Sequence, residues 1–515
     1  MTKRYYSHRS SPTHRAALCL LFRSGRTQYR HRRGVLGPFL QWLFGIPPRR
    51  SNYAANQYYA PKRGSRRTGT TRSTSPRTST SRSTAPRTDY ARAADRQPPT
   101  SGSSGRAPTL AEQHAQSYRQ RGQGTAPASH QRTFHQSRPS DKGIRSNVVH
   151  QSQGSQVFQP LPPPSGPAPY RLSLDNVLPA AQMTAIRNSG RIMMHVAGDT
   201  GGVKSPEPQQ IVAMAMEKHF EFPDATTRPA FFYHLGDVVY YYGEPREYYP
   251  QFYDAYMHYP APIFAIPGNH DGDLTVGSPP SLAAFANNFC AATPHVTAEA
   301  GETTRDAMTQ PNVYFTLEAP FVTMVGLYSN VPEGGKLDDT QIAWFVEEMK
   351  AAPTDKALIV SVHHPPFSGD MHHSGSTYIG RVLDNAFQQA GRLPDLVFSA
   401  HVHNYQRFTR TTGGRHTPYI VAGAGGYWHL HYMAKQPDGS KTPVPYKIPD
   451  ADLMLENYCD DRHGFLRIMI TPRLISGEYF ACPRPHESWR GQADRIDGFV
   501  LDWHTHKLTK GTDLR

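Results

Sequence analysis

Two stretches of this chain decide its fold: FFYHLGDVVY, which is Phe231–Tyr240, and PIFAIPGNHD, which is Pro262–Asp271. Each begins with a short apolar run and then passes through Gly into residues that can bind ions. Apolar runs of roughly four to eight residues bounded by turn residues are typical of buried strands. We therefore interpret both stretches as a strand followed at once by a polar loop.

The same pattern occurs at three other places. Apolar runs over Arg191–Gly198, Lys356–Val362 and Asp395–Ala400 are followed by Asp199, by His363 and His364, and by His401 and His403. Helical patterns stand between the runs, over Gln209–Phe220, Tyr248–Tyr259, Asp339–Ala351 and Tyr378–Ala390. Strands that alternate with helices predict a layered α/β domain. Sites in such sheets gather at the carboxyl ends of the strands, where these polar residues stand.

The composition divides the chain into two parts. Of its 515 residues, 1–170 hold 28 basic and 4 acidic residues, whereas 171–515 hold 28 basic and 37 acidic residues. The net charge of +15 therefore comes from the N-terminal part and does not indicate a nucleic-acid-binding protein as a whole. The run Ser65–Thr88 has no apolar periodicity, so we expect a disordered basic tail over 1–170 and a catalytic domain over 171–515. A chain that begins near Tyr170 should then keep full activity.

The role of the tail is open. It fits a targeting segment, a start site assigned too far upstream, or a surface that contacts anionic partners. The apolar stretch Gly34–Pro47 is shorter than the ~20 residues that span a bilayer, and we find no convincing signal peptide. Both the cytoplasm and export remain open. Cys459 and Cys482 could pair in an exported protein, but their spacing does not decide it.

The strand-end residues suggest a metal centre. Two carboxylates, one amide and three imidazoles are more than one ion needs, and they suit two ions that share a carboxylate. Mixed oxygen and nitrogen ligands favour Fe, Mn or Zn over Ca. The alternative is that these are unrelated turn residues and core histidines.

Five motifs in order carry a resemblance to a known family. They are Gly198-Asp199, Gly236-Asp237-Val238-Val239-Tyr240, Gly268-Asn269-His270-Asp271, His363-His364-Pro365 and Ala400-His401-Val402-His403. Over about residues 190–430, the chain resembles the calcineurin-like metallophosphoesterase superfamily, and more closely the purple acid phosphatases. Gly201 stands where most of the superfamily has His, and Tyr240 supplies a phenol instead. The pair His372-His373 follows His363 at the spacing of plant-type members.

The resemblance implies a four-layer α/β/β/α sandwich with two metal ions, Fe(III) and a divalent Fe, Zn or Mn. It assigns Asp199, Asp237, Tyr240 and His403 to metal one, and Asp237, Asn269, His363 and His401 to metal two. His270 would contact the phosphate or protonate the leaving oxygen, and His372 and His373 would bind the phosphate. His364 would be a neighbour of the site. Tyr240 could instead be a packing aromatic.

The expected function is hydrolysis of phosphate monoesters, in which a metal-activated hydroxide attacks phosphorus in line. One alternative is a phosphodiesterase on the same scaffold. Another is a protein that binds anionic surfaces through its tail and keeps only a vestigial site. The sequence indicates no specific nucleic-acid partner and leaves the physiological substrate and oligomeric state open.

Some positions depart from the family or carry weaker signals. Ala400 replaces a Gly, and Gln406 replaces a Glu whose contact is then in doubt. We expect a long surface loop over residues 433–462 and strands of a second sheet over Gly464–Ile470, Glu478–Ala481 and Gly498–Trp503. His504 and His506 fit a solvated edge strand.

Overall fold

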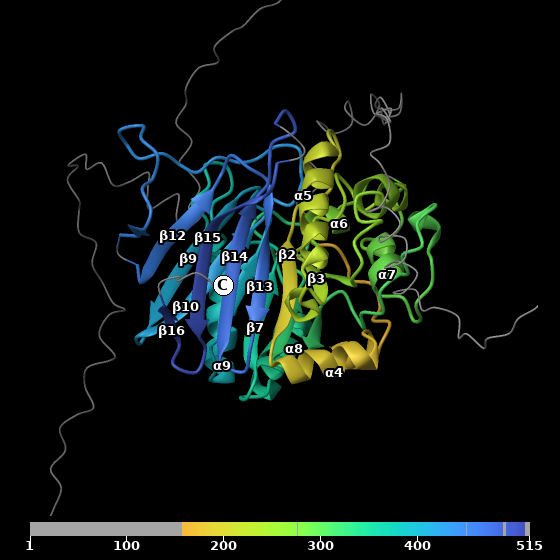
Figure 1. The fold of residues 1–515 in the computed structure, drawn as a ribbon, viewed down its shortest axis with the longest axis horizontal. Helices are drawn as coiled ribbons and strands as arrows, with labels where there is room; N and C mark the ends of the chain where they lie inside the picture. Colours follow the sequence, from red (N-terminus) through yellow and green to blue (C-terminus); the bar gives the residue numbers. More distant parts are fainter. Residues whose placement is uncertain (1–156, 276, 450, 488–490, 510–515) are drawn as a thin grey trace, which may run out of the picture.

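The computed structural model describes residues 157–275, 277–449, 451–487 and 491–509, so residues 1–156 of the tail predicted over 1–170 lie outside them (Figure 1). The described chain forms two β-sheets and helices on their outer faces. Figure 1 places the late strands β13 (Gly464–Ile470), β14 (Leu474–Ala481) and β15 (Asp494–Asp502) beside the early strand β2 (Ile192–Ala197). The C-terminal strands therefore complete the sheet that the first half of the domain begins.

The larger sheet has nine strands in the order β1-β5-β6-β7-β8-β10-β9-β12-β11. Its strands are β1 (Arg171–Ser173), β5 (Phe315–Glu318), β6 (Val322–Leu327), β7 (Ala357–Val362), β8 (Leu396–Ser399), β9 (Tyr405–Thr412), β10 (Arg415–Ala422), β11 (Tyr446–Lys447) and β12 (Leu453–Cys459). Strands β6, β7, β8 and β10 are parallel, so β7 and β8 end at the same edge.

The smaller sheet has seven strands in the order β16-β15-β14-β13-β2-β3-β4. It adds β3 (Phe231–His234), β4 (Ile263–Ala265) and β16 (Lys507–Thr509) to the strands named above. Strands β2, β3 and β4 are parallel. Their carboxyl ends therefore also meet at one edge.

The helices are α4 (Ala180–Ser189), α5 (Glu207–Glu217), α6 (Asn269–Gly272), α7 (Ala283–Phe289), α8 (Asp339–Ala351) and α9 (Thr377–Ala390). Helices cover both outer faces, whereas α4 packs against the core between the sheets. Alternation along the strands builds three apolar cores. In β7, Ile359 faces the core between the sheets, whereas Val360 faces α8 and α9. In β3, Phe232 faces the core under α5 and α7. The expected α/β/β/α sandwich is confirmed.

Local signals fix the helix ends. The side chain of Asp338 accepts a hydrogen bond from the Gln341 N–H at the start of α8, and Ser376 does the same for Ile379 at the start of α9. Helix α9 ends at Gly391, whose φ of 64° is the left-handed conformation that glycine adopts without strain. These caps explain why the predicted bounds of both helices agree with the structure to within one residue.

Three sequence expectations need correction. Tyr248–Tyr259 is not an α-helix, since only Tyr249–Tyr253 forms one wide turn, and Pro250 has no N–H to donate. Residues 433–462 are not all loop, because they contain the edge strand β11 and its neighbour β12. His504 and His506 lie in the turn between β15 and β16 and not in a strand.

The segment 157–170 lies against the domain. The N–H groups of Ser165 and Gly166 donate to the Pro311 carbonyl, and the Trp344 indole N–H donates to the Pro169 carbonyl. Cys459 and Cys482 are buried free thiols in the structure. No helix of the described part combines the length and apolar character needed to cross a membrane.

Candidate metal centre

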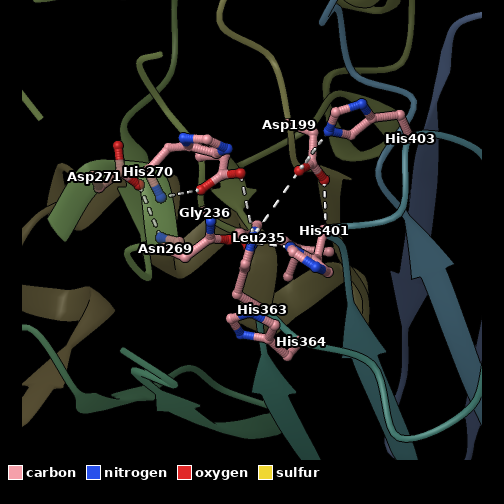
Figure 2. A network of polar contacts seen from close by, with 12 residues as sticks. Asp199, Leu235, Gly236, Asn269, His270, Asp271, His363, His364, His401 and His403 are labelled. Atoms are coloured by element: carbon pink, nitrogen blue, oxygen red, sulfur yellow. Dashed lines mark hydrogen bonds and ion pairs between the residues drawn. The ribbon is translucent and has the colours of Figure 1, made fainter. Parts of the chain in front are cut away.

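The candidate centre lies where strands of both sheets end. Asp199 follows β2, Asp237 follows β3, His363 follows β7, and His401 follows β8. Asp199, Asp237 and His401 have φ of 54°, 53° and 65°, a region that non-glycine residues seldom occupy. Such strained backbone clusters at functional sites. Figure 2 shows Asp199 and His401 close together, with a hydrogen bond from the His401 backbone N–H to the Asp199 carboxylate.

Three side chains assigned to metal one lie together. The Tyr240 hydroxyl donates to Asp199 Oδ1 at 3.1 Å and lies 3.3 Å from His403 Nε2. His403 Nε2 lies 3.6 Å from the same carboxylate oxygen. Tyr240 and Asp199 are fully buried. The phenol thus points at the other two ligand atoms and does not serve only as a packing aromatic.

The side chains assigned to metal two also converge. His363 Nε2 lies 3.4 Å from Asp237 Oδ2, and His401 Nδ1 lies 3.0 Å from Asn269 Oδ1. Ligand atoms of Asp237, His363 and His401 lie within 4.8 Å of one another. His363 Nε2 is also 4.0 Å from Asp199 Oδ1, so the two groups of proposed ligands lie next to each other.

In two of the histidines, a hydrogen bond to a backbone carbonyl determines which ring nitrogen faces the proposed metal site. His363 Nδ1 donates to the Leu235 carbonyl at 2.8 Å, and His403 Nδ1 donates to the His429 carbonyl at 3.2 Å. A carbonyl can only accept, so Nε2 of each neutral ring carries the lone pair. Both Nε2 atoms face the carboxylates. Metal-binding histidines are commonly oriented in this way.

The donor set fits metal ions. Asp237 Oδ2 and His363 Nε2 are buried and make no hydrogen bond in the described structure, although they lie close together. Buried polar atoms without partners are costly, so two of them facing one another indicate that another group belongs between them. The mixture of carboxylate, amide, phenol and imidazole suits Fe, Zn or Mn.

The pKa values of Tyr240 and His363 are also shifted in ways that fit a metal site. Burial raises the pKa of the Tyr240 phenol well above its ordinary value, and Asp199 and Asp237 raise it further. A phenolate at this position would therefore need a strongly charged cation beside it. Burial alone would lower the pKa of His363, but Asp237 and Asp199 raise it to about 9. Metal binding would displace that proton.

The three proposed substrate histidines line two sides of the centre. His270 Nδ1 donates to the Tyr241 carbonyl at 2.8 Å, and its ring lies 4.6 Å from the Tyr240 ring. The backbone N–H groups of His372 and His373 both donate to Asp370 Oδ1 at 2.7 Å. The His373 ring lies 4.8 Å from that of His401, whereas the exposed His372 ring is 5.6 Å from that of His431. His373 is thus closer to the ligands than His372.

Some residues of the centre were missed in the sequence. Glu333 Oε1 lies 3.2 Å from His373 Nδ1 and 3.4 Å from His401 Nε2. The His431 ring stacks on His403 at 4.3 Å. Neither residue has a motif beside it. Asp271, present in a motif but given no role, accepts the N–H groups of Gly268, Val238 and Val239 and so shapes the Asp237 loop.

The two departures from the family have structural correlates. A Cβ on Gly198 would lie 2.5 Å from the Ala400 Cβ, so the loops after β2 and β8 are in close contact. Gln406 Oε1 accepts the Gly369 N–H at 2.6 Å, and its amide donates to Ser368. Gln406 therefore supports the loop that carries His372 and His373. His364 accepts or donates a hydrogen bond with Ser329 at 2.7 Å.

Comparison with known proteins agrees with this geometry. The family model for calcineurin-like phosphoesterase matches residues 195–405. Purple acid phosphatase 15 of Arabidopsis thaliana is 24% identical over 198 residues, which cover 37% of this chain and 34% of that protein. The chain thus spans about a third of the length of this curated relative. These matches confirm the resemblance to the calcineurin-like metallophosphoesterases and to the purple acid phosphatases.

The matches among solved structures include two with different descriptions. Purple acid phosphatase PPD1 from yellow lupin (Lupinus luteus) is 16% identical, with a TM-score of 0.43, and the match covers 61% of this chain and 54% of that chain. GAP50, the anchor in the inner membrane complex of Plasmodium, is 14% identical, with a TM-score of 0.40 and coverage of 60% and 90%.

Proposed function

We propose that this chain hydrolyses phosphate monoesters at a centre of two metal ions, one Fe(III) and one divalent Fe, Zn or Mn. Asp199, Asp237, Tyr240 and His403 would hold the first ion, and Asp237, Asn269, His363 and His401 the second. One observation carries the proposal. The Tyr240 hydroxyl lies 3.1 Å from Asp199 Oδ1 and 3.3 Å from His403 Nε2, as a phenolate ligand would.

When bound, two such ions would supply Lewis acidity toward the phosphoryl oxygens and a nucleophile from water at neutral pH. The protein must then orient the ester and supply a proton. His373 and His372 would donate hydrogen bonds to the phosphoryl oxygens, and their loop is fixed by Asp370. His270, whose Nδ1 is committed to the Tyr241 carbonyl, would protonate the leaving oxygen from Nε2 as the P–O bond breaks.

The test is metal analysis of the purified full-length chain together with its visible absorption spectrum. We expect iron and a visible tyrosinate-to-Fe(III) band that disappears in Tyr240→Phe. Tyr242→Phe is the matched control, because it removes a buried phenol two residues away and should keep the band. A colourless Zn or Mn protein with full activity would contradict the iron assignment and leave the phosphoesterase.

Substrate preference needs its own assay. We expect faster turnover of p-nitrophenyl phosphate than of bis(p-nitrophenyl) phosphate. The reverse order would indicate a phosphodiesterase. Binding of metal without hydrolysis of either ester would favour a protein with a vestigial site.

A further inference from the structure

The loop between β6 and α8 brings a carboxylate to the metal centre. Glu333 lies in this loop, and its side chain is 51% exposed. The Oε1 atom nevertheless reaches two imidazoles, His373 Nδ1 at 3.2 Å and His401 Nε2 at 3.4 Å. One of these rings belongs to the proposed ligands of metal two and the other to the proposed phosphate-binding pair. A single oxygen thus contacts both parts of the centre.

Two backbone hydrogen bonds close the loop that carries Glu333 into a turn. The Gly335 N–H donates to the Pro332 carbonyl at 2.8 Å, and the Lys336 N–H donates to the Ser329 carbonyl at 2.6 Å. Gly334 and Gly335 have φ of 80° and 75°, which only glycine adopts readily. This hydrogen-bonded turn places Glu333 at its tip, directly before Gly334.

The same loop is fastened to the segment before β1. Asn330 Oδ1 accepts the Gln159 N–H at 2.8 Å, and Asn330 Nδ2 donates to the Gln159 carbonyl at 2.9 Å. This reciprocal pair joins residues 171 positions apart. Glu333 lies three positions after Asn330, so the pair restrains the loop close to the carboxylate.

Each of the three proposed metal-binding histidines has one ring nitrogen that faces away from the metal site. The three residues differ in the group that contacts this nitrogen. His363 and His403 donate Nδ1–H to backbone carbonyls. His401 presents Nδ1 to Asn269 Oδ1 at 3.0 Å, on the side of the second metal site, so its Nε2 is the outer nitrogen. A carboxylate on the outer nitrogen fixes the tautomer and ring orientation of a ligand and raises its basicity. Glu333 stands where such a carboxylate is needed.

Electrostatics favour a positioning role over direct contact with the substrate. An isolated carboxylate beside a phosphate-binding site would repel the anion. Here Oε1 lies within hydrogen-bond distance of two imidazoles that can donate to it. Their N–H groups would neutralise the carboxylate locally and be oriented by it. The same contact would hold the His373 ring toward the centre.

We propose that Glu333 is a positioning residue that orients His401 as a metal ligand and His373 as a phosphate-binding group through one carboxylate oxygen. This inference rests on the proposed function, since it assigns partners to that same centre. It adds a residue that no motif of the sequence indicates.

The experiment compares Glu333→Ala and Glu333→Gln with the unchanged full-length chain. The first readout is Zn²⁺ affinity, measured by competition with a chromogenic chelator after the protein has been stripped of metal. Removal of an outer partner of a ligand typically weakens metal binding about 10–100-fold. We expect a loss of that size for Glu333→Ala and a smaller loss for Glu333→Gln, which keeps an acceptor oxygen.

The second readout is the steady-state kinetics of p-nitrophenyl phosphate hydrolysis with saturating metal. A positioning role predicts a lower kcat/KM, because His373 loses its orientation. If KM instead falls and Zn²⁺ affinity is unchanged, Glu333 only repels the substrate and the proposal is wrong. His373→Ala separates the two proposed contacts of Glu333. It removes only the contact with the phosphate-binding group, so it should lower kcat/KM without the loss of Zn²⁺ affinity.

The matched control is Glu347→Ala on α8, an exposed glutamate paired with Lys350, which should change neither readout. Unchanged Zn²⁺ affinity in Glu333→Ala would overturn the inference. The two failures can be told apart. If the unchanged chain binds Zn²⁺ but hydrolyses no phosphate ester, the proposed function fails, while the difference in affinity still decides the role of Glu333 at His401.

Discussion

His270 is the residue whose chemistry can be isolated most cleanly from metal binding. Its Nδ1 is occupied by the Tyr241 carbonyl, so only Nε2 can give a proton to the leaving oxygen. General acids contribute about 10²–10⁴-fold to such steps, and poor leaving groups need them most. We expect His270→Asn to lower kcat for phenyl phosphate by at least about 100-fold. The loss should be much smaller for p-nitrophenyl phosphate, because nitrophenolate leaves without a proton.

Two results bear on that expectation. Equal losses for both esters would show that His270 binds the phosphate and does not protonate the leaving group. The control is His295→Asn. His295 is exposed and its Nδ1 lies 2.9 Å from the Thr293 carbonyl, so this variant should leave both rates unaltered.

Residues of this centre could be predicted when they stood at strand ends. Asp199, Asp237, His363 and His401 each follow an apolar run, and the parallel strands carry them to one edge. Glu333 could not be found in this way, because it lies in a loop whose path depends on contacts with distant residues. Its approach to His401 results from the turn at Gly334 and Gly335 and from the pairing of Asn330 with Gln159, and neither has a pattern in the sequence.

At the scale of elements, a buried ion pair joins the two sheets beside the centre. Arg407 on β9 donates two hydrogen bonds to Asp497 on β15, at 2.7 and 2.9 Å, and both side chains are buried. The Tyr405 hydroxyl also donates to Asp497 at 2.6 Å. Removing one partner of a buried pair leaves an uncompensated charge and costs about 3–5 kcal/mol. We therefore expect Arg407→Met to lower the free energy of unfolding by about that amount.

The same pair predicts a pH dependence. Burial alone would raise the pKa of Asp497, but hydrogen bonds and charge from Arg407 lower it overall. A lowered pKa in the folded state contributes stability that is present above the unfolded value of about 4 and is lost as the pH falls through the folded value. The difference between Arg407→Met and the unchanged chain should thus be full at pH 7 and shrink below about pH 4.

Urea unfolding at several pH values measures both effects. Arg410→Met is the matched control, because Arg410 on the same strand pairs with the exposed Asp384. Exposed pairs are worth about 0–1 kcal/mol, so this variant should be nearly neutral. Similar losses in both variants would mean that burial of the Arg407–Asp497 pair has no special effect.

Elements themselves were predictable to different degrees. Helices α8 and α9 have side-chain caps and apolar spacing, and the sequence placed them within one residue. The tyrosine-rich stretch after Tyr248 has helical spacing too, but its aromatic residues pack into the core under α5 as a wide turn and further turns. Packing of large rings against the sheet overrides the local periodicity there.

At the scale of the whole molecule, the sandwich explains why one site needs residues from position 199 to position 403. The first proposed ligands follow strands of the smaller sheet and the last ones follow strands of the larger sheet, and His363 of one group lies 3.4 Å from Asp237 of the other. The shared core between the sheets fixes their relative position, with Val196 and Phe398 both fully buried in it. The geometry of the centre therefore depends on the packing of the sheets against each other.

The segment 157–170 belongs to this arrangement, which changes where the catalytic unit should begin. Ser165 and Gly166 are bonded to Pro311, Pro169 accepts from Trp344, and Gln159 pairs with Asn330 beside the Glu333 loop. Each such hydrogen bond contributes about 1 kcal/mol net. We expect a chain that starts at residue 157 to match the full-length protein in stability and kcat/KM. A chain that starts at residue 171 lacks these five hydrogen bonds and should lose about 5 kcal/mol and part of its kcat/KM.

Asn330→Gly in the full-length chain isolates the contribution of the active-site loop from that of overall stability. Asn330 has a φ of 58°, which Gly adopts without strain, so the variant removes both hydrogen bonds to Gln159 and leaves the backbone free to keep its path. If the segment acts through the Glu333 loop, Asn330→Gly should lower kcat/KM and Zn²⁺ affinity in the same direction as removal of residues 1–170. Suppose instead that both the shortened chain and Asn330→Gly keep full activity. The segment is then the passive linker that composition alone predicts, and the catalytic unit begins near Tyr170.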